Sequence, residues 1–272
     1  MNTLRFIFLL SLLTGLLIAI GYFAARWKGV AIALLLSALM NLGSYWYSDK
    51  IVLGMYGAQP LSQQEAPEIY LLVEELARKA QIPTPRIYLV PSKTPNAFAT
   101  GRNENHAVVA VTAGILNLVN REELEGVIAH ELSHIKNRDI LISTMTATLA
   151  SAVVMLARWA VFFGQDERSV IPTLALAIVA PVAATAIQMA ISRSREYEAD
   201  ASAARITGKP EALASALLKL ATWSERRPMK ANPATAHMFI VNPLSGGSIR
   251  ELFSTHPPIE KRVEKLLKMK GN

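Results

Sequence analysis

With 272 residues, of which 51% are hydrophobic and only 18% charged, the chain is too apolar for an ordinary soluble domain, in which about a quarter of the residues are charged. Because the sequence has no cysteine, disulfides, iron–sulfur clusters and thiolate metal sites are excluded, and any metal must be bound by His and carboxylate side chains. The net charge of +7 could indicate a nucleic-acid partner, but a membrane protein whose basic residues face an anionic leaflet has the same balance, and we favour that interpretation.

Four apolar stretches are each about as long as the roughly 20 residues that a helix needs to cross a bilayer core. They cover approximately residues 4–25, 30–47, 140–163 and 170–191. The first could instead be a signal peptide, although its apolar run is longer than is usual for one. The last two are rich in alanine and could be buried soluble helices, but the short polar turn at residues 164–169 predicts an antiparallel hairpin in either case.

The distribution of basic residues predicts the orientation. Only four of the 28 Lys and Arg residues lie at the far ends of the two predicted hairpins: Arg26, Lys28, Arg158 and Arg168. Since segments rich in Lys and Arg tend to stay in the cytoplasm, we expect a multi-pass protein whose polar segments 51–138 and 193–272 share the cytoplasmic face.

Residues 120–137 predict a helix that carries the most informative motif. Asn120 and Glu123 have the spacing of a capping box. His130 and His134 are four residues apart, so both rings project from one helical face and can bind one ion, while Glu131 is placed to take a proton from the attacking water. This is the H-E-x-x-H pattern of zinc peptidases, which arises by chance in roughly one chain of this length in a hundred.

Two histidines leave a catalytic zinc ion short of its usual three protein ligands. Glu196 and Asp200, which follow the fourth apolar stretch, are also four residues apart and would share a helical face. Glu196 could bind the metal, and Asp200 could accept the second ring N–H of a metal-binding histidine. The alternative is a solvated helix end, in which Arg193 and Arg195 pair with these acids.

Together these motifs resemble the HtpX branch of the membrane zinc peptidases, which is related to the CAAX prenyl proteases. The resemblance extends nearly end to end and, besides the two hydrophobic hairpins, includes residues 96–101, 127–134, 194–200, 237–243 and 255–258. It implies one zinc ion per chain with Glu196 as the third ligand. It also implies an endopeptidase of the bacterial inner membrane that degrades misfolded or damaged membrane proteins during envelope stress, with anionic lipids and membrane substrates as partners and no nucleic acid.

Two further groups are candidates for the site. His256 precedes Pro257 and Pro258, and a rigid loop could present its ring to the developing oxyanion; the alternative is a surface histidine before an amphipathic helix. Residues 87–90, 97–100 and 107–112 predict short strands. An edge strand among them could pair with an extended substrate backbone, so substrate binding is predicted at Asn96, Ala97 and Phe98, unless the sheet only supports the helix.

The predicted fold is a mainly α integral membrane protein with four transmembrane helices and an α+β, zincin-like catalytic domain with a small sheet. We expect an N-terminal hairpin (1–50), a first catalytic part (51–138), a second hairpin (139–192) and a second catalytic part (193–272). A transporter is disfavoured because Arg158 has no acidic partner within the spans, and a zinc-stabilised scaffold would not need Glu131. An intramembrane protease of the site-two type would place the motif inside an apolar span, whereas charged residues flank this one.

Overall fold

The computed structural model describes residues 3–163, 170–226, 240 and 256–270. The predicted turn at 164–169 and, apart from Ile240, the motif at 237–243 lie outside the described residues. The chain divides into two compact units, one of residues 1–45 and 141–192 and the other of residues 46–140 and 193–272. The finer division at residues 50, 138 and 192 stays a prediction.

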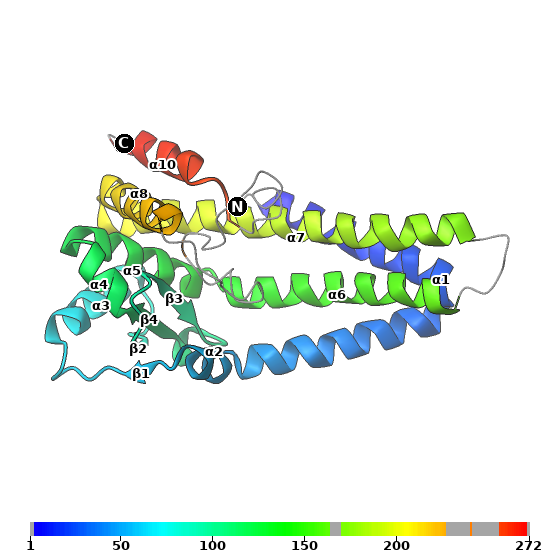
Figure 1. Cartoon of the computed structure of the whole chain (residues 1–272), viewed down its shortest axis with the longest axis horizontal. Helices are drawn as coiled ribbons and strands as arrows, with labels where there is room; N and C mark the ends of the chain where they lie inside the picture. The colour runs from blue at the N-terminus through cyan, green and yellow to red at the C-terminus, as the bar shows by residue number, and fades with distance from the viewer. Residues whose placement is uncertain (1–2, 164–169, 227–239, 241–255, 271–272) are drawn as a thin grey trace. The chain divides into compact units, whose positions relative to one another are not determined.

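The first unit is built from long apolar helices. They are α1 (Thr3–Trp46), most of α6 (Asp139–Phe163) and the first part of α7 (Val170–Thr207). Figure 1 shows α1 as two limbs that meet at a bend. Leu17 of α1, Leu156 of α6 and Ala184 of α7 belong to one buried cluster. Among the described residues one helical segment, Asp139–Ala157, is long and apolar enough to cross a membrane, so the four spans remain a prediction.

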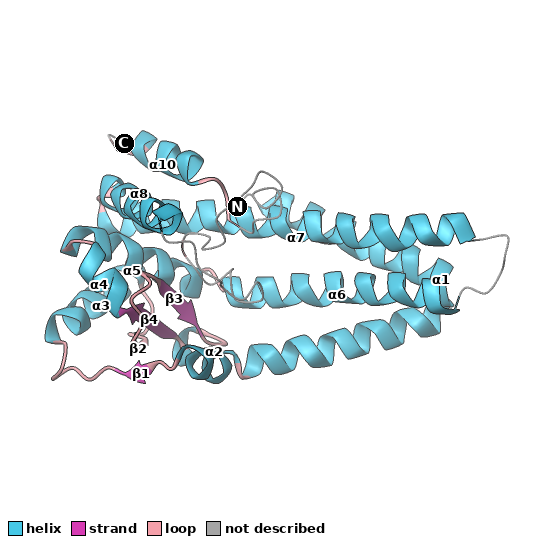
Figure 2. Cartoon of the chain, in the orientation of Figure 1, coloured by secondary structure: helices cyan, strands magenta, loops and turns pink. Residues whose placement is uncertain are grey.

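A four-stranded mixed sheet forms one layer of the second unit (Figure 2). Its order is β1 (Gln59–Pro60), β2 (Arg86–Val90), β4 (Val108–Thr112) and β3 (Ala97–Thr100). β2 and β4 are parallel, whereas β3 runs antiparallel to β4. The three strands expected from the sequence are thus confirmed, and β3 lies at an edge of the described sheet.

Helices pack against this sheet and against each other. They are α2 (Ser48–Tyr56), α3 (Pro67–Ala80), α4 (Ala113–Leu118), α5 (Arg121–Lys136), the end of α7, α8 (Pro210–Arg226) and α10 (Ile259–Lys268). Leu76 of α3, Val109 of β4, Ile128 of α5 and Leu217 of α8 are buried in one core cluster. This core surrounds α5, the helix that carries the H-E-x-x-H motif.

Candidate metal centre

A capping box fixes the start of α5. The Asn120 side chain accepts a hydrogen bond from the Glu123 N–H at 2.9 Å, and the Glu123 carboxylate accepts one from the Asn120 N–H at 2.8 Å. The same carboxylate accepts from the Ser215 hydroxyl and the Lys219 ammonium of α8, both at 2.7 Å. Its burial is therefore matched by several hydrogen bonds, and these bonds tie the motif helix to α8.

His130, His134 and Glu196 converge on one point from α5 and α7. The Nε2 atoms of the two rings lie 3.1 Å apart. Glu196 Oε1 lies 3.5 Å from His134 Nε2, and Glu196 Oε2 lies 3.7 Å from His130 Nε2. Among the described residues these three form the group able to hold a metal ion, with ligand atoms within 4.8 Å of one another.

A carboxylate lies next to the Nδ1 atom of each histidine ring, on the side opposite Nε2. His130 Nδ1 lies 3.0 Å from Asp200 Oδ1, and His134 Nδ1 lies 2.7 Å from Asp139 Oδ2. The His134 contact is a hydrogen bond, and since a carboxylate only accepts, His134 Nδ1 carries the proton; the Nε2 atoms of both rings face the other ligands. The sequence analysis missed Asp139, which lies five residues after His134 at the start of α6.

Two arginines, Arg262 and the partly buried Arg195, contact these carboxylates, and the sequence analysis assigned neither of them to the site in this way. Arg262 of α10 is completely buried and donates to both oxygens of Asp200, at 2.8 and 2.7 Å. It also lies 3.3 Å from Glu196 Oε2 and donates to the Ile240 carbonyl at 3.0 Å. Arg195 forms an ion pair with Asp139 and donates to the Asn137 carbonyl. The bidentate contact of Arg262 fixes the Asp200 carboxylate in orientation as well as in position.

Glu131 lies between the ligands and next to the edge strand. Its Oε2 accepts a hydrogen bond from the Ala99 N–H at 2.7 Å, so the Ala99 amide points away from β4 and toward α5. By the alternation of an antiparallel pair, the backbones of Ala97 and Ala99 face outward while those of Asn96 and Phe98 face β4.

The predicted substrate-binding residues have different surroundings in the structure. Asn96 is buried, exchanges backbone and side-chain hydrogen bonds with Thr112, and accepts one from the Ile240 N–H on its side chain. Phe98 is buried against Tyr56 of α2, with ring centroids 5.3 Å apart. Ala97, like Ala99, has its backbone turned away from β4, but Ala97 is completely buried, whereas Ala99 is partly exposed.

His256 is buried beside the same cluster, although sequence reasoning had left a surface position open. Its Nε2 lies 3.7 Å from Glu196 Oε2. Burial, with Arg262 nearby, lowers the pKa of His256 to about 4 despite the attraction of Glu196. The ring is thus neutral at physiological pH and keeps one N–H to donate.

The charges within the cluster are strongly coupled. Burial opposes a charge on His130, but the neighbouring carboxylates of Asp200 and Glu196 outweigh it and raise the pKa of this ring to about 9. Burial and the charge on His130 lower the pKa of His134. Burial also opposes the charge of Glu196, yet His256, His130 and Arg262 hold its pKa well below the usual range. Glu196 is therefore ionised and able to bind a cation.

The donor set fits a zinc ion. With Zn–N distances of about 2.0–2.1 Å, ligand atoms of a tetrahedral site lie about 3.3 Å apart, close to the separations among the three residues. Glu196 Oε2 is buried and, among the described residues, has ion-pair neighbours but no hydrogen-bond partner. Two histidines and one glutamate also form a known catalytic zinc set, which leaves one position for water or substrate.

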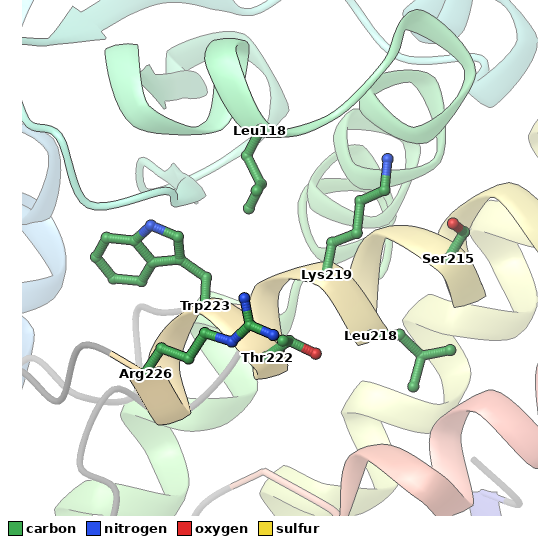
Figure 3. A pocket seen from close by; sticks show the side chains of 7 residues that line it. All are labelled: Leu118, Ser215, Leu218, Lys219, Thr222, Trp223 and Arg226. Carbon is green, nitrogen blue, oxygen red and sulfur yellow. The ribbon is translucent and has the colours of Figure 1, made fainter.

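A separate cavity of about 580 Å³ lies along α8. Figure 3 shows Leu118, which comes from α4, facing a row of α8 side chains that includes Lys219, Trp223 and Arg226. None of the metal-binding candidates lines this cavity. The cavity is linked to the site only indirectly: Lys219, which lines it, donates a hydrogen bond to Glu123 in the first turn of the motif helix α5.

Metal-binding residues on two helices, a glutamate between the histidines and an edge strand beside it define a metallopeptidase of the H-E-x-x-H class. The profile of Peptidase family M48 matches residues 63–270, and the chain belongs to this family. The chain is therefore an enzyme that hydrolyses peptide bonds.

Relatives described as Protease HtpX homolog cover nearly the whole chain, which confirms the resemblance to the HtpX branch. Identity is 57% to the protein from Pyrococcus abyssi, over 96% of this chain and 93% of that one. It is 54% to the protein from Desulforapulum autotrophicum (97% and 89%) and 52% to the protein from Salinibacter ruber (100% and 99%). The crystal structure of S. mikatae Ste24p is similar in fold, with a TM-score of 0.62 at 19% identity; the match covers 94% of this chain but only 62% of the Ste24p chain.

Proposed function

We propose that this chain is a zinc endopeptidase that cleaves misfolded or damaged membrane proteins. The observation that carries the proposal is the convergence of His130, His134 and Glu196 beside a carboxylate, Glu131, that is fixed by the edge strand. When bound, the zinc ion supplies a Lewis acid and lowers the pKa of a water molecule toward about 7.

Glu131 acts as the general base. Burial raises the pKa of Glu131, which brings it closer to the pH at which a base both accepts and releases a proton efficiently. The Ala99 N–H holds Oε2, so Oε1 is left to take a proton from the attacking water and to pass it to the leaving amine. The neutral His256 ring donates its N–H to the oxyanion that develops on the scissile carbonyl.

An unfolded substrate binds along β3. The Ala99 carbonyl, which faces away from β4 and whose own N–H is bonded to Glu131, accepts a hydrogen bond from an extended peptide, and backbone pairing of this kind tolerates many sequences. Such tolerance suits substrates that are recognised because they are unfolded rather than by a sequence motif.

Full-length protein purified in detergent tests the activity. Elemental analysis should find about one zinc per chain, and hydrolysis of an unfolded protein should stop on chelation and return with zinc. Glu131→Gln should retain zinc and fold but lose at least about 10²-fold in turnover, the lower range for a general base. Near-normal turnover in this variant would refute the mechanism.

For the cellular role, we propose the bacterial inner membrane under envelope stress, with the catalytic residues in the cytoplasm. The excess of Lys and Arg in the polar segments supports this orientation. Cells that lack the protein should accumulate a misfolded membrane reporter, and wild type but not Glu131→Gln should clear it. Equal reporter levels in all three strains would contradict the role while leaving the peptidase activity intact.

A further inference from the structure

Helix α2 presents an exposed apolar stripe. Tyr47, Ile51 and Met55 are spaced by four residues, so they lie along one face, and they are 55%, 47% and 55% exposed. Trp46, which ends α1, is 56% exposed next to this stripe in the sequence. Large apolar side chains grouped on one face usually mark a contact with a partner or a membrane.

The opposite face of α2 is anchored, so the exposure of the stripe does not result from a loose helix. Leu53 is buried, and Tyr56 packs against Phe98 of β3. Asp49 accepts a hydrogen bond from Arg86 of β2 at 2.8 Å. α2 is therefore a fixed amphipathic helix with one side on the sheet and the other in solvent.

The charges around the stripe suit an anionic surface. The Lys50 ammonium lies 5.9 Å from the Tyr47 ring, and the Arg102 guanidinium lies 4.9 Å from the Trp46 ring. The carboxylate of α2, Asp49, is paired with Arg86. Trp and Tyr favour the level of the lipid headgroups, and Lys and Arg nearby are attracted to anionic lipids.

We propose that α2 lies in the surface of an anionic lipid bilayer, with Tyr47, Ile51 and Met55 at the boundary between headgroups and acyl chains. The inference rests on the proposed membrane location of α1. Because α2 begins two residues after the end of α1, α2 must begin where α1 leaves the bilayer. Since α2 separates β3 from the lipid, the substrate strand would lie roughly one helix diameter, about 10 Å, from the membrane surface. A segment that leaves the bilayer could then reach β3 directly.

Fluorescent labels on single cysteines test this in the full-length protein, which has no native cysteine. Ile51→Cys and Met55→Cys, labelled with an environment-sensitive dye and reconstituted in vesicles that contain anionic lipid, should lose most of their emission when the acyl chains carry bromine. Leu71→Cys is the matched control, because Leu71 is 58% exposed but has Glu68, Glu74 and Glu75 within one helical turn. Its emission should be unchanged.

A label at Leu39→Cys, on α1, separates the inference from the membrane assignment. Quenching at Leu39 and Ile51 but not at Leu71 is the expected result. Quenching at Leu39 alone would overturn the placement of α2, and emission unchanged at all four positions would overturn the membrane location as well. Energy transfer between Ile51 labels on different chains, without quenching, would identify a second copy as the partner and also overturn the proposal. Zinc content and hydrolysis in detergent, measured on the same variants, should remain normal in every case.

Discussion

At the scale of single residues, the two carboxylates behind the histidines test how the site is oriented. Asp139→Asn and Asp200→Asn keep the side-chain size but remove the negative charge next to each Nδ1 atom, and such changes typically cost about 10–100-fold in metal affinity or activity. Asp200→Asn should have the larger effect because it removes the charge opposite Arg262, which is completely buried and would keep only Glu196 as an ion-pair partner among the described residues. Zinc affinity measured by chelator competition, together with hydrolysis rates, provides the readout.

Glu198→Gln is the control for these two variants. Glu198 lies on α7, as Asp200 does, but its carboxylate is 3.6 Å from Arg205 and does not face the site. It should leave both quantities unchanged. Wild-type zinc affinity and activity in both Asp variants would mean that the carboxylates do not position the rings.

The protonation of His130 predicts how metal affinity depends on pH. Because its pKa is raised to about 9, zinc must displace a proton from the ring at any lower pH. Affinity should therefore increase about tenfold per pH unit as the pH rises toward 9 and then level off. Asp200→Asn removes a cause of the raised pKa, so the plateau should begin at a lower pH. An affinity independent of pH between 6 and 8 would contradict this protonation state.

The placement of the site's side chains in pairs could be predicted from the sequence because a helix converts a spacing of four residues into proximity, whereas the approach of Glu196 to the two histidines was implied only by the family resemblance. His130 with His134, and Glu196 with Asp200, both follow that rule. No spacing rule connects His134 to Asp139, because a residue with positive φ, Arg138, separates their helices. Arg262 did leave a signal: it interrupts the apolar stripe of Ile259, Val263 and Leu266, which is unusual unless the charge has a buried partner.

At the scale of secondary structure, local rules predicted the elements around the motif. The capping box at Asn120 and the three strands at residues 87–90, 97–100 and 107–112 are confirmed. The sequence did not predict which strand lies at the edge, because strand order depends on contacts between distant segments. The short strand β1 was not predicted, since its two residues carry no alternating pattern.

The close approach of α5 to α8 depends on a glycine. A Cβ atom at Gly126 would lie 3.0 Å from the backbone of Leu213. Gly126→Val should force the helices apart and lower the free energy of unfolding by about 1–3 kcal/mol, the usual range for overpacking. Thermal unfolding in detergent measures the loss.

Gly54→Val is the matched control, because Gly54 is also helical but has open space where its Cβ atom would lie. Its effect should remain within about 0.5 kcal/mol, as for most surface substitutions. Equal stabilities of the two variants would show that the α5–α8 contact tolerates a larger side chain.

At the scale of the whole molecule, the distribution of charge predicts a topology that single cysteines can test. Lys28→Cys should react with an impermeant thiol reagent in intact cells, whereas Gln64→Cys, in the exposed loop before α3, should react only after lysis. Both positions are exposed, so a difference in reactivity reports the side of the membrane. The reverse pattern would place the catalytic residues outside the cytoplasm.

The separation of the ligands along the chain has a consequence for biosynthesis. When a ribosome has translated as far as Ser192, the nascent polypeptide contains His130, His134 and Asp139 but neither Glu196 nor Asp200. A chain stopped there should bind zinc no better than Glu196→Gln, which can be measured on the truncated product. The protease would thus remain inactive throughout most of its own translation. It could not cleave neighbouring nascent chains before Glu196 has been translated.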